Sequence, residues 1–376
     1  MRICIVSQNA RPGLLIFRRD LIVHLIREGH EVYAFANDYD EKSVKDVEGL
    51  GAIAVSYSLN KAGLNPFGDL IDIFKLYRKF KAINADVVLS SFIKPSVYAT
   101  IASAACRVPR RIAMLEGLGY IHTSGLKGKR IKKELLRRIH GVMCSVGYYF
   151  AHEVVFLNYD DPEDLRRYAY IPHEKVTVLG AIGLKLADFP FSKPLKPIPL
   201  RFIFIARLLK EKGIQEFITA ARIVRSVTTS VEFIILGDID SANPSSLSKA
   251  ELDTLLSENL VSYPGHVASV VPWLSDSHVF VLPSYREGFP RSTQEAMAIG
   301  RAVITTDVPG CRDCVVDKRN GFLVRPQSAT DLADKMLKFV DSPSLVLSMG
   351  LESYEIAKER FDVDKVNSRL LDIMKV

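Results

Sequence analysis

Short apolar runs alternate along this chain with longer segments in which apolar residues recur every three or four positions. In the first half, the apolar runs predict β-strands at 2–6, 31–36, 53–58, 86–90, 110–115, 153–157 and 176–179. Helical patterns lie between them, two examples being 14–28, which Gly29 ends, and 68–83. Short strands alternating with helices predict a parallel sheet covered by helices on both faces.

Four prolines interrupt this alternation between residues 187 and 200. So dense a run of proline favours a stiff, extended linker over a helix or a central strand. The alternation then resumes with strands at 201–206, 231–236, 278–282 and 302–305 and helices at 213–226, 247–257, 292–300, 328–340, 343–360 and 363–375.

The pattern therefore predicts an α/β protein with two doubly wound, Rossmann-like domains that face each other across a cleft. We expect the first domain at 1–186, the linker at 187–200 and the second domain at 201–360. The last residues, 361–376, are expected to form a helix that packs back on the first domain. Sheets of this kind bind ligands at the carboxyl ends of their strands.

Composition limits the class of protein. A length of 376 residues, 48% apolar and 25% charged, fits two soluble globular domains. We expect no membrane-spanning helix and no signal peptide, because no uncharged apolar stretch is long enough and the N-terminus reads as a strand. Five cysteines, an odd number, fit reduced cytoplasmic thiols. Cys311 and Cys314 form a lone CxxC, for which packing is favoured over redox or metal roles.

The positive charge is unevenly placed. Residues 1–183 hold 26 Lys and Arg against 19 Asp and Glu, so they carry the whole net charge of +7. Such asymmetry indicates an anionic partner for the first half of the chain.

The strand at 278–282 leads into the stretch with the clearest candidate chemistry. Glu287 lies in a loop with Gly288 and Pro290, and Glu295 is expected in the first turn of the next helix. Free N–H groups of such a loop and the positive end of a helix dipole favour a phosphate. Taken alone, the two glutamates would favour a solvated pair that caps a helix.

A basic pair precedes these carboxylates in the chain. Arg207 and Lys212 directly follow the strand at 201–206, and two cations at such a place suit a diphosphate.

In this order and spacing, the basic pair with Gly213 and the two glutamates resemble the retaining, nucleotide-sugar-dependent glycosyltransferases of family 4, which have two Rossmann-like domains. The resemblance covers nearly the whole chain. A closer likeness is to bacterial members that transfer an N-acetylhexosamine to an undecaprenyl-diphosphate-linked saccharide. It rests on Leu64-Asn65-Pro66-Phe67, Glu116-Gly117-Leu118-Gly119, Leu282-Pro283-Ser284-Tyr285, Glu287-Gly288-Phe289-Pro290, and Asp307 with Gly310-Cys311.

The resemblance implies roles for individual residues. The residues implied to be catalytic are Glu287, Arg207, Lys212 and Glu116. Those implied to bind the donor are Gly13, Arg18, Arg207, Lys212, Gly237, His266, Val267, Glu287, Gly288, Phe289, Pro290 and Glu295. Those implied to face the acceptor or a membrane are Glu116, His122, Lys127, Lys129, Arg130, Lys132 and Lys133.

Several of these positions depart from the family pattern or allow a simpler explanation. The family carries two adjacent glycines where this chain has only Gly13, so a plain turn competes with donor contact there. Glu116 stands near the place of a family histidine. It either binds an acceptor hydroxyl, or stabilises positive charge at the anomeric carbon, or only caps a glycine turn. Gly237 and the Gly265-His266-Val267 turn approach the nucleotide in the family.

Two further patterns each allow more than one interpretation. Asp238 and Asp240 form a D-x-D that could bind a metal, but they lie in a strand-exit turn, so we expect no metal. The segment 126–138 combines seven Lys and Arg with an apolar side, so a helix here is either a solvated surface helix or a docking site for anionic lipids.

The sequence thus predicts a metal-independent glycosyltransferase that needs no cofactor besides its UDP-sugar donor. We expect a polyprenyl-linked saccharide acceptor, no nucleic-acid partner, and a peripheral position on the inner face of the cytoplasmic membrane. Two alternatives stay open: a hydrolysing sugar-nucleotide epimerase, and a non-catalytic protein that binds sugar nucleotides or lipid-linked glycans.

Overall fold

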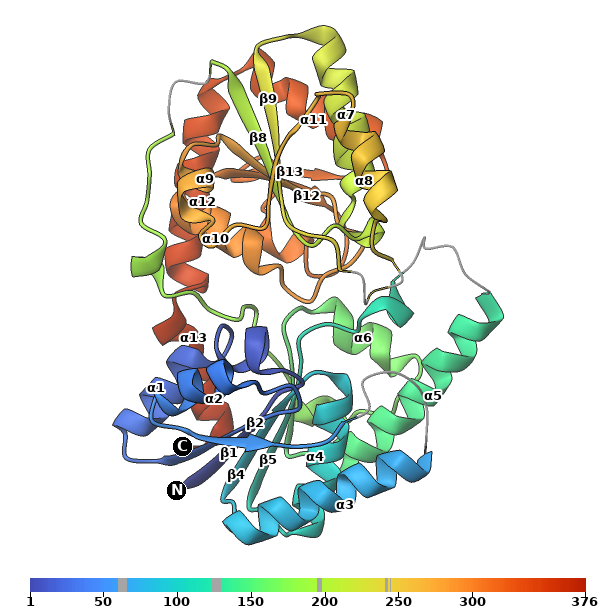
Figure 1. Ribbon diagram of the computed structural model, residues 1–376, viewed down its shortest axis with the longest axis vertical. Coiled ribbons are helices and arrows are strands. Elements are labelled where there is room, and N and C mark those ends of the chain that lie inside the picture. The colour runs from blue at the N-terminus through green and yellow to red at the C-terminus, as the bar shows by residue number, and fades with distance from the viewer. Residues whose placement is uncertain (60–65, 124–129, 195–197, 241–242, 244) are drawn as a thin grey trace. The chain divides into compact units, whose positions relative to one another are not determined.

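The computed structural model describes residues 1–376 except 60–65, 124–129, 195–197, 241–242 and 244, and it divides into two compact units. The first unit comprises the described parts of Met1–His122, Gly128–Gly183 and Val363–Val376, and the second is centred on Leu184–Asp362. Each unit contains one parallel sheet with helices on both of its faces (Figure 1). The predicted α/β class with two doubly wound domains is confirmed.

The first sheet has the order β3-β2-β1-β4-β5-β6-β7, and every neighbouring pair in it is parallel. Its strands are β1 (Arg2–Val6), β2 (Glu31–Ala36), β3 (Ile53–Ser56), β4 (Val87–Ser91), β5 (Arg110–Leu115), β6 (Glu153–Phe156) and β7 (Val176–Val178). Its helices are α1 (Arg19–Arg27), α2 (Glu41–Glu48), α3 (Pro66–Ile83), α4 (Ile93–Ala105), α5 (Arg130–Tyr149), α6 (Asp160–Arg166) and α13 (Val363–Met374). The central strands are apolar and buried, as a sheet covered on both faces requires.

The second sheet has the order β10-β9-β8-β11-β12-β13, again with parallel neighbours. Its strands are β8 (Leu200–Ile205), β9 (Val231–Leu236), β10 (Ser262–Gly265), β11 (Val279–Leu282), β12 (Ala302–Thr306) and β13 (Gly321–Val324). Its helices are α7 (Ile214–Val227), α8 (Lys249–Leu256), α9 (Val271–Ser275), α10 (Arg291–Ile299), α11 (Ala329–Asp341) and α12 (Ser344–Arg360). In both sheets the chain order reverses beside the first strand, which is where doubly wound sheets bind ligands.

The proline-rich stretch that was expected to be a linker packs on the second unit in its described part. The ring centroid of Phe191 lies 4.9 Å from that of Tyr354 on α12, and the Ser192 N–H donates to Ile299 O at 3.0 Å. The chain passes between the units at Gly183–Leu184 and again at Asp362–Val363. The C-terminal helix α13 therefore belongs to the first unit, where it contacts α1 and β5.

The helix expected at 14–28 begins later than its apolar pattern indicates. Residues Ala10–Leu14 form one wide π-type turn, and α1 begins only at Arg19. The side-chain carbonyl of Asn9 accepts the Gly13 N–H at 3.1 Å, which ties this turn to the end of β1. Asn9 thus caps the start of this turn, as such a side chain caps the start of a helix, and the apolar pattern alone gave no sign of the turn.

No helix in the described parts of the chain is long and apolar enough to cross a membrane.

Candidate functional site

Lys212 and Glu287 form an ion pair at the carboxyl edge of the second sheet. Lys212 ends the short turn after β8, and its Nζ lies 2.5 Å from Glu287 Oε1 in the loop after β11. The two loops meet closely at Gly213, where a Cβ atom would lie 2.1 Å from the Pro283 carbonyl oxygen. Neighbouring parallel strands thus bring together two residues that are 75 positions apart in the chain.

Glu287 is held by contacts on several sides. The Ser284 hydroxyl donates to Glu287 Oε1 at 2.7 Å, and the Glu287 N–H donates to Pro309 O at 3.1 Å. Gly310 lies under this loop with φ of 77°, and a Cβ there would come within 2.3 Å of the Glu287 carbonyl oxygen. The Glu287 side chain is 11% exposed and that of Lys212 is 18% exposed, so both remain accessible to a small ligand.

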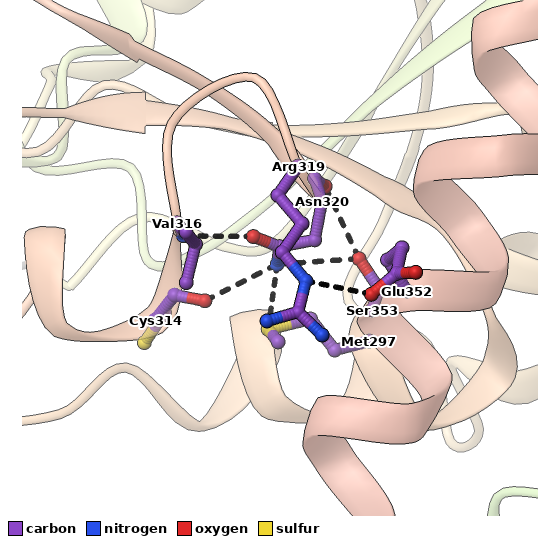
Figure 2. A network of polar contacts seen from close by, with 7 residues as sticks. All are labelled: Met297, Cys314, Val316, Arg319, Asn320, Glu352 and Ser353. Carbon is purple, nitrogen blue, oxygen red and sulfur yellow. Dashed lines mark hydrogen bonds and ion pairs between the residues drawn. The ribbon is translucent and has the colours of Figure 1, made fainter.

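A buried polar network fixes the segment that follows Gly310. Asn320 is fully buried, and its Oδ1 accepts the Val316 N–H at 2.8 Å while its Nδ2 donates to Cys314 O at 3.3 Å (Figure 2). The Ser353 hydroxyl on α12 donates to the Asn320 carbonyl at 3.2 Å. This network connects α12 with the loop on which Glu287 rests. Because buried polar groups are costly when unpaired, it favours a single loop conformation.

Glu295 does not lie in the first turn of its helix, where it was expected. The helix α10 begins at Arg291, one residue earlier than predicted, so Glu295 lies in the second turn and pairs with Arg291 at 2.9 Å. Burial raises the pKa of the Glu295 carboxyl, and the Arg291 charge opposes that shift. The i, i+4 spacing of Arg291 and Glu295 was visible in the sequence and could have predicted this pair.

The helix α10 presents its N-terminal N–H groups near the Lys212–Glu287 pair. The N-cap is Pro290, which has no N–H, and the Gln294 N–H bonds to the Pro290 carbonyl. The N–H groups of Arg291, Ser292 and Thr293 therefore precede the first intrahelical bond. Their dipole favours negative charge.

Two of the expected donor residues next to this helix can contribute little of what was expected. The Phe289 side chain is 3% exposed and packs on Phe361 with ring centroids 5.5 Å apart. Only the Phe289 backbone can therefore meet a ligand, and Pro290 offers no N–H.

Arg207 lies apart from the Lys212–Glu287 pair in its contacts. Its Nη1 is 2.6 Å from Asp240 Oδ2, and its side chain is 61% exposed. The described residues contain no group of three or more His, Cys, Asp or Glu that could hold a metal ion. The pair between Arg207 and Asp240 is a contact that sequence reasoning missed.

The expected base-contact residues follow β9 and β10. Gly237 has φ of 141°, and a Cβ there would lie 1.9 Å from the Ala206 carbonyl oxygen at the end of β8. The Gly237 N–H donates to Gly265 O at 3.0 Å, and His266 is exposed directly after it. Val267 is half-buried. These residues therefore lie at the same sheet edge as Arg207.

In the first unit, the expected donor residue Arg18 and the expected catalytic residue Glu116 form a sealed ion pair. Arg18 precedes α1 and is 2% exposed, and the Glu116 side chain, after β5, is 5% exposed. The Arg18 guanidinium also donates to Phe17 O at 3.0 Å and lies 3.5 Å from the Ser91 hydroxyl. Burial raises the pKa of Glu116, opposed by the Arg18 charge. Both side chains are thus too buried to face open solvent.

The backbone is strained next to Ser91, which contacts Arg18. Phe92, directly after β4, has φ of 72° and ψ of 161°, a region that glycine alone adopts freely. Gly13 lies against the end of β1, where a Cβ would lie 1.9 Å from the buried Ser7 hydroxyl. Close packing therefore explains why position 13 is glycine.

His122 is buried in a line of polar groups that runs along α5. Its Nε2 lies 3.0 Å from His140 Nδ1, and His140 Nε2 lies 3.3 Å from Cys144 Sγ. Burial lowers the pKa of His140 to about 4, so this imidazole is neutral at ordinary pH. The network was missed because its members are spread over 22 positions with no motif, and it orients His122 toward the interior.

The basic segment 126–138 lies only partly within the described structure. Lys127 and Lys129 are outside the described residues, as are the side chains of Arg130 and Lys132. The helix expected there exists as α5, and Lys133 is half-buried on it. Ile131, Leu135 and Arg138 of this helix are exposed by 85%, 58% and 73% respectively.

The fold and this cluster define a class of protein. Two parallel, doubly wound sheets, the second with a basic and acidic cluster at its carboxyl edge, are the architecture of B-type glycosyltransferases. A family described as "Glycosyltransferase Family 4" matches residues 16–180, and one described as "Glycosyl transferases group 1" matches residues 199–342. The chain belongs to the family 4 glycosyltransferases, as its sequence motifs indicated.

Relatives and solved structures agree with this assignment. The chain is 28% identical to the N,N'-diacetylbacillosaminyl-diphospho-undecaprenol alpha-1,3-N-acetylgalactosaminyltransferase of Campylobacter jejuni, over 99% of this chain and 98% of that protein. It is 25% identical to the capsular polysaccharide biosynthesis glycosyltransferase CapM of Staphylococcus aureus, over 91% and 89%. Its fold is similar to that of Anabaena HepE in complex with UDP, with a TM-score of 0.79 and 17% identity over the full length of both chains.

Proposed function

We propose that this protein transfers an N-acetylhexosamine from a UDP-sugar to a polyprenyl-diphosphate-linked saccharide, with retention of the anomeric configuration and without a metal ion. The name of the Campylobacter relative gives an undecaprenol-linked acceptor and N-acetylgalactosamine as the transferred sugar. The similar Anabaena structure contains UDP. Both pieces of evidence favour a UDP-sugar donor and a lipid-linked acceptor in this chain.

The observation that carries the proposal is the Lys212–Glu287 pair beside the N-terminus of α10. A diphosphate bound here would share Lys212 with Glu287 and would meet the N–H groups of the α10 N-terminus. Arg207, exposed on the same sheet edge, would supply a second cation. Negative charge that develops on the departing UDP would thus be met by preorganised positive charge.

The carboxylates are assigned to the sugars of the donor. In this proposal Glu287 accepts hydrogen bonds from hydroxyls of the transferred sugar, and Glu295 accepts them from the ribose. The bond between the anomeric carbon and the phosphate oxygen breaks, and UDP leaves with the electron pair. The acceptor hydroxyl oxygen bonds to the anomeric carbon, and an oxygen of the departing phosphate takes the proton of that hydroxyl. Because these cations already oppose the charge of the phosphate, no metal ion is required.

The first unit is assigned to the acceptor. Glu116 and Arg18 are sealed by their mutual pair, so we assign them to holding the loop after β5 in place rather than to contact with the donor. His122 follows in the same loop and is likewise buried. The cationic segment 126–138 would bring the protein to an anionic membrane surface that carries the lipid-linked acceptor.

One assay separates this proposal from its alternatives. The protein is incubated with several UDP-sugars, with and without a polyprenyl-diphosphate-sugar acceptor. Release of UDP that depends on the acceptor is expected, and it should survive EDTA. Product without acceptor would indicate an epimerase, and binding without turnover would indicate a binding protein. Inhibition by EDTA that magnesium reverses would overturn the metal-free assignment and favour Asp238 and Asp240 as ligands.

Membrane association has its own test. Binding to liposomes that contain anionic lipid is expected at low salt, and it should be lost when Lys129, Arg130, Lys132 and Lys133 are changed together to glutamine. Each cation near such a surface contributes about 1 kcal/mol, so four together should decide residence on the membrane. The same variant should keep its turnover on a short, soluble acceptor analogue. If the unchanged protein does not bind anionic liposomes at low salt, the segment 126–138 is a solvated helix.

A further inference from the structure

The helix α3 exposes a row of large apolar side chains that its own unit does not cover. Phe67 is 81% exposed, Leu70 64%, Ile71 54% and Phe74 59%. Their spacing of three and four residues places them on one side of the helix. Single exposed apolar residues are ordinary, but four in a row on one helix form a contiguous patch of the kind that marks an interaction site.

Folding does not require this row. The opposite side of α3 supplies Leu76 and Phe80, which are fully buried in the core of the first unit together with Val97 and Tyr98 of α4. The helices α3 and α5 both pack against α4, so the three form one layer on the first sheet (Figure 1). A surface helix needs only one apolar side to hold its place in such a layer. The outer row of α3 therefore has another use.

The charges of α3 point to the chemistry of its partner. The two acidic residues are engaged within the unit: Asp69 Oδ1 lies 3.6 Å from Lys94 Nζ, and Asp72 Oδ1 accepts the Ser58 hydroxyl at 2.6 Å. The exposed charged residues of this helix are all positive, namely Lys75, Arg78 and Lys81. Aromatic and aliphatic side chains flanked by exposed cations are the pattern of a helix that lies in the interface of an anionic bilayer.

We propose that the outer face of α3 inserts into the headgroup and upper acyl region of an anionic membrane, with Phe67 and Phe74 as its deepest side chains. This inference deepens the proposed function and rests on it only in naming the membrane as the place of work. A second copy of this chain is a poorer occupant, because two copies would bring Lys75 and Arg78 against the same cations. Insertion of α3 adds an apolar contribution that salt does not screen, whereas the 126–138 segment acts through charge.

The first experiment removes the aromatic side chains and leaves every charge in place. The variant Phe67→Ser/Phe74→Ser should bind vesicles of phosphatidylglycerol and phosphatidylcholine at least tenfold more weakly, both at low and at high salt. The control Val227→Ser/Leu351→Ser removes two exposed apolar side chains of the second unit, which are 66% and 44% exposed, and should bind like the unchanged protein. Equal binding of all three proteins would overturn the proposal.

A second experiment reads insertion directly. The chain has one tryptophan, Trp273 in the second unit, so Phe74→Trp adds one reporter on α3 and Val227→Trp a matched reporter elsewhere. With vesicles, the Phe74→Trp protein should shift its emission to shorter wavelength and be quenched by brominated acyl chains, and the Val227→Trp protein should do neither. Binding without quenching would mean that α3 stays outside the bilayer. Self-association that the Phe67→Ser/Phe74→Ser variant abolishes would identify a second copy as the occupant. Either result overturns the proposal.

These measurements use vesicles without donor or acceptor. A protein that inserts but transfers no sugar would refute the proposed function and leave this inference standing. A protein that glycosylates a soluble acceptor, but whose Phe74→Trp fluorescence is not quenched by brominated acyl chains, would refute this inference and leave the proposed function standing.

Discussion

Each unit carries a pair of opposite charges at the carboxyl edge of its sheet, and the two pairs differ in access. Arg18 and Glu116 of the first unit are 2% and 5% exposed, whereas Lys212 and Glu287 of the second are 18% and 11% exposed. Two charges that are sealed from solvent can interact only with each other and with the protein around them. An accessible pair can also bind a ligand. The comparison assigns a structural task to the first pair and a chemical task to the second.

The topology explains why similar residue types end in different surroundings. Arg18 and Lys212 both precede the helix that follows the first strand of their sheet. Glu287, however, follows β11, the direct neighbour of β8, whereas Glu116 follows β5, which is separated from β1 by β4. To reach Glu116, Arg18 must cross the end of β4 beside Ser91, and this crossing buries it. A neighbour contact at a sheet edge needs no such burial.

Removing one partner of the sealed pair should therefore give the largest effect of all, and the effect should be on stability. Arg18→Ala leaves the Glu116 carboxylate buried without its cation, which typically costs 3–5 kcal/mol. We expect a loss of about that size in the free energy of unfolding, measured by urea denaturation. In the double variant Arg18→Met/Glu116→Leu no charge is left unpaired, so it should recover much of the loss. An Arg18→Ala protein as stable as the original would contradict the assigned structural task.

The corresponding change in the accessible pair should affect turnover instead. Lys212→Ala should lower kcat/KM by about a hundredfold or more, because one preorganised donor to developing charge is worth about 2.7–4 kcal/mol. Its thermal unfolding should change little. The control is Lys210→Ala, two residues away, which removes only the surface pair between Lys210 and Glu251. If both variants lose turnover equally, the effect is one of local charge and the phosphate assignment is wrong.

Sequence patterns predicted what depends on periodicity and on the ends of strands. Both sheets, their parallel order of strands and helices, and the position of Lys212 and Glu287 at one edge follow from apolar runs and from the residues that come directly after them. Two short edge strands were missed, β10 and β13, because each gains its only partner strand from elsewhere in the chain, β10 from β9 and β13 from β12. Local pattern cannot reveal a strand that is defined by its neighbour.

The side-chain partners were harder to predict than the strands. The family resemblance implied that Arg18 binds the donor, yet its partner Glu116 lies 98 positions away and no spacing rule connects them. Arg207 was paired in our expectations with Lys212, whereas its contact is Asp240. Such pairs depend on which loops the strand order brings together. By contrast, Ser284 and Arg291 lie three and four positions from their glutamates, and local spacing could have found both.

The two carboxylates of the second unit should separate into different phenotypes. Glu287→Gln should lower kcat at least tenfold with little change in the affinity for UDP, because contacts with the transferred sugar act at the transition state. Glu295→Gln should weaken the binding of UDP itself by about tenfold, because the ribose is part of UDP. Isothermal calorimetry with UDP and steady-state kinetics measure the two effects. Equal losses of UDP affinity in both variants would contradict the division of roles.

The smallest effect concerns pH and returns to the sealed pair. Burial raises the pKa of Glu116 above its ordinary value of 4.5, so between these two values the folded protein keeps a proton that the unfolded chain has lost. The free energy of unfolding therefore falls as pH rises through that interval, and the contribution is complete below 4.5 and lost above the raised pKa. One proton gives a slope of at most about 1.4 kcal/mol per pH unit. Denaturation of Glu116→Gln should show a correspondingly flatter pH profile, whereas the control Glu134→Gln, on the half-exposed carboxylate of α5, should follow the original protein. A Glu116→Gln profile parallel to the original would mean that Glu116 has the same pKa in the folded and unfolded states, and that the Arg18 charge cancels the effect of burial.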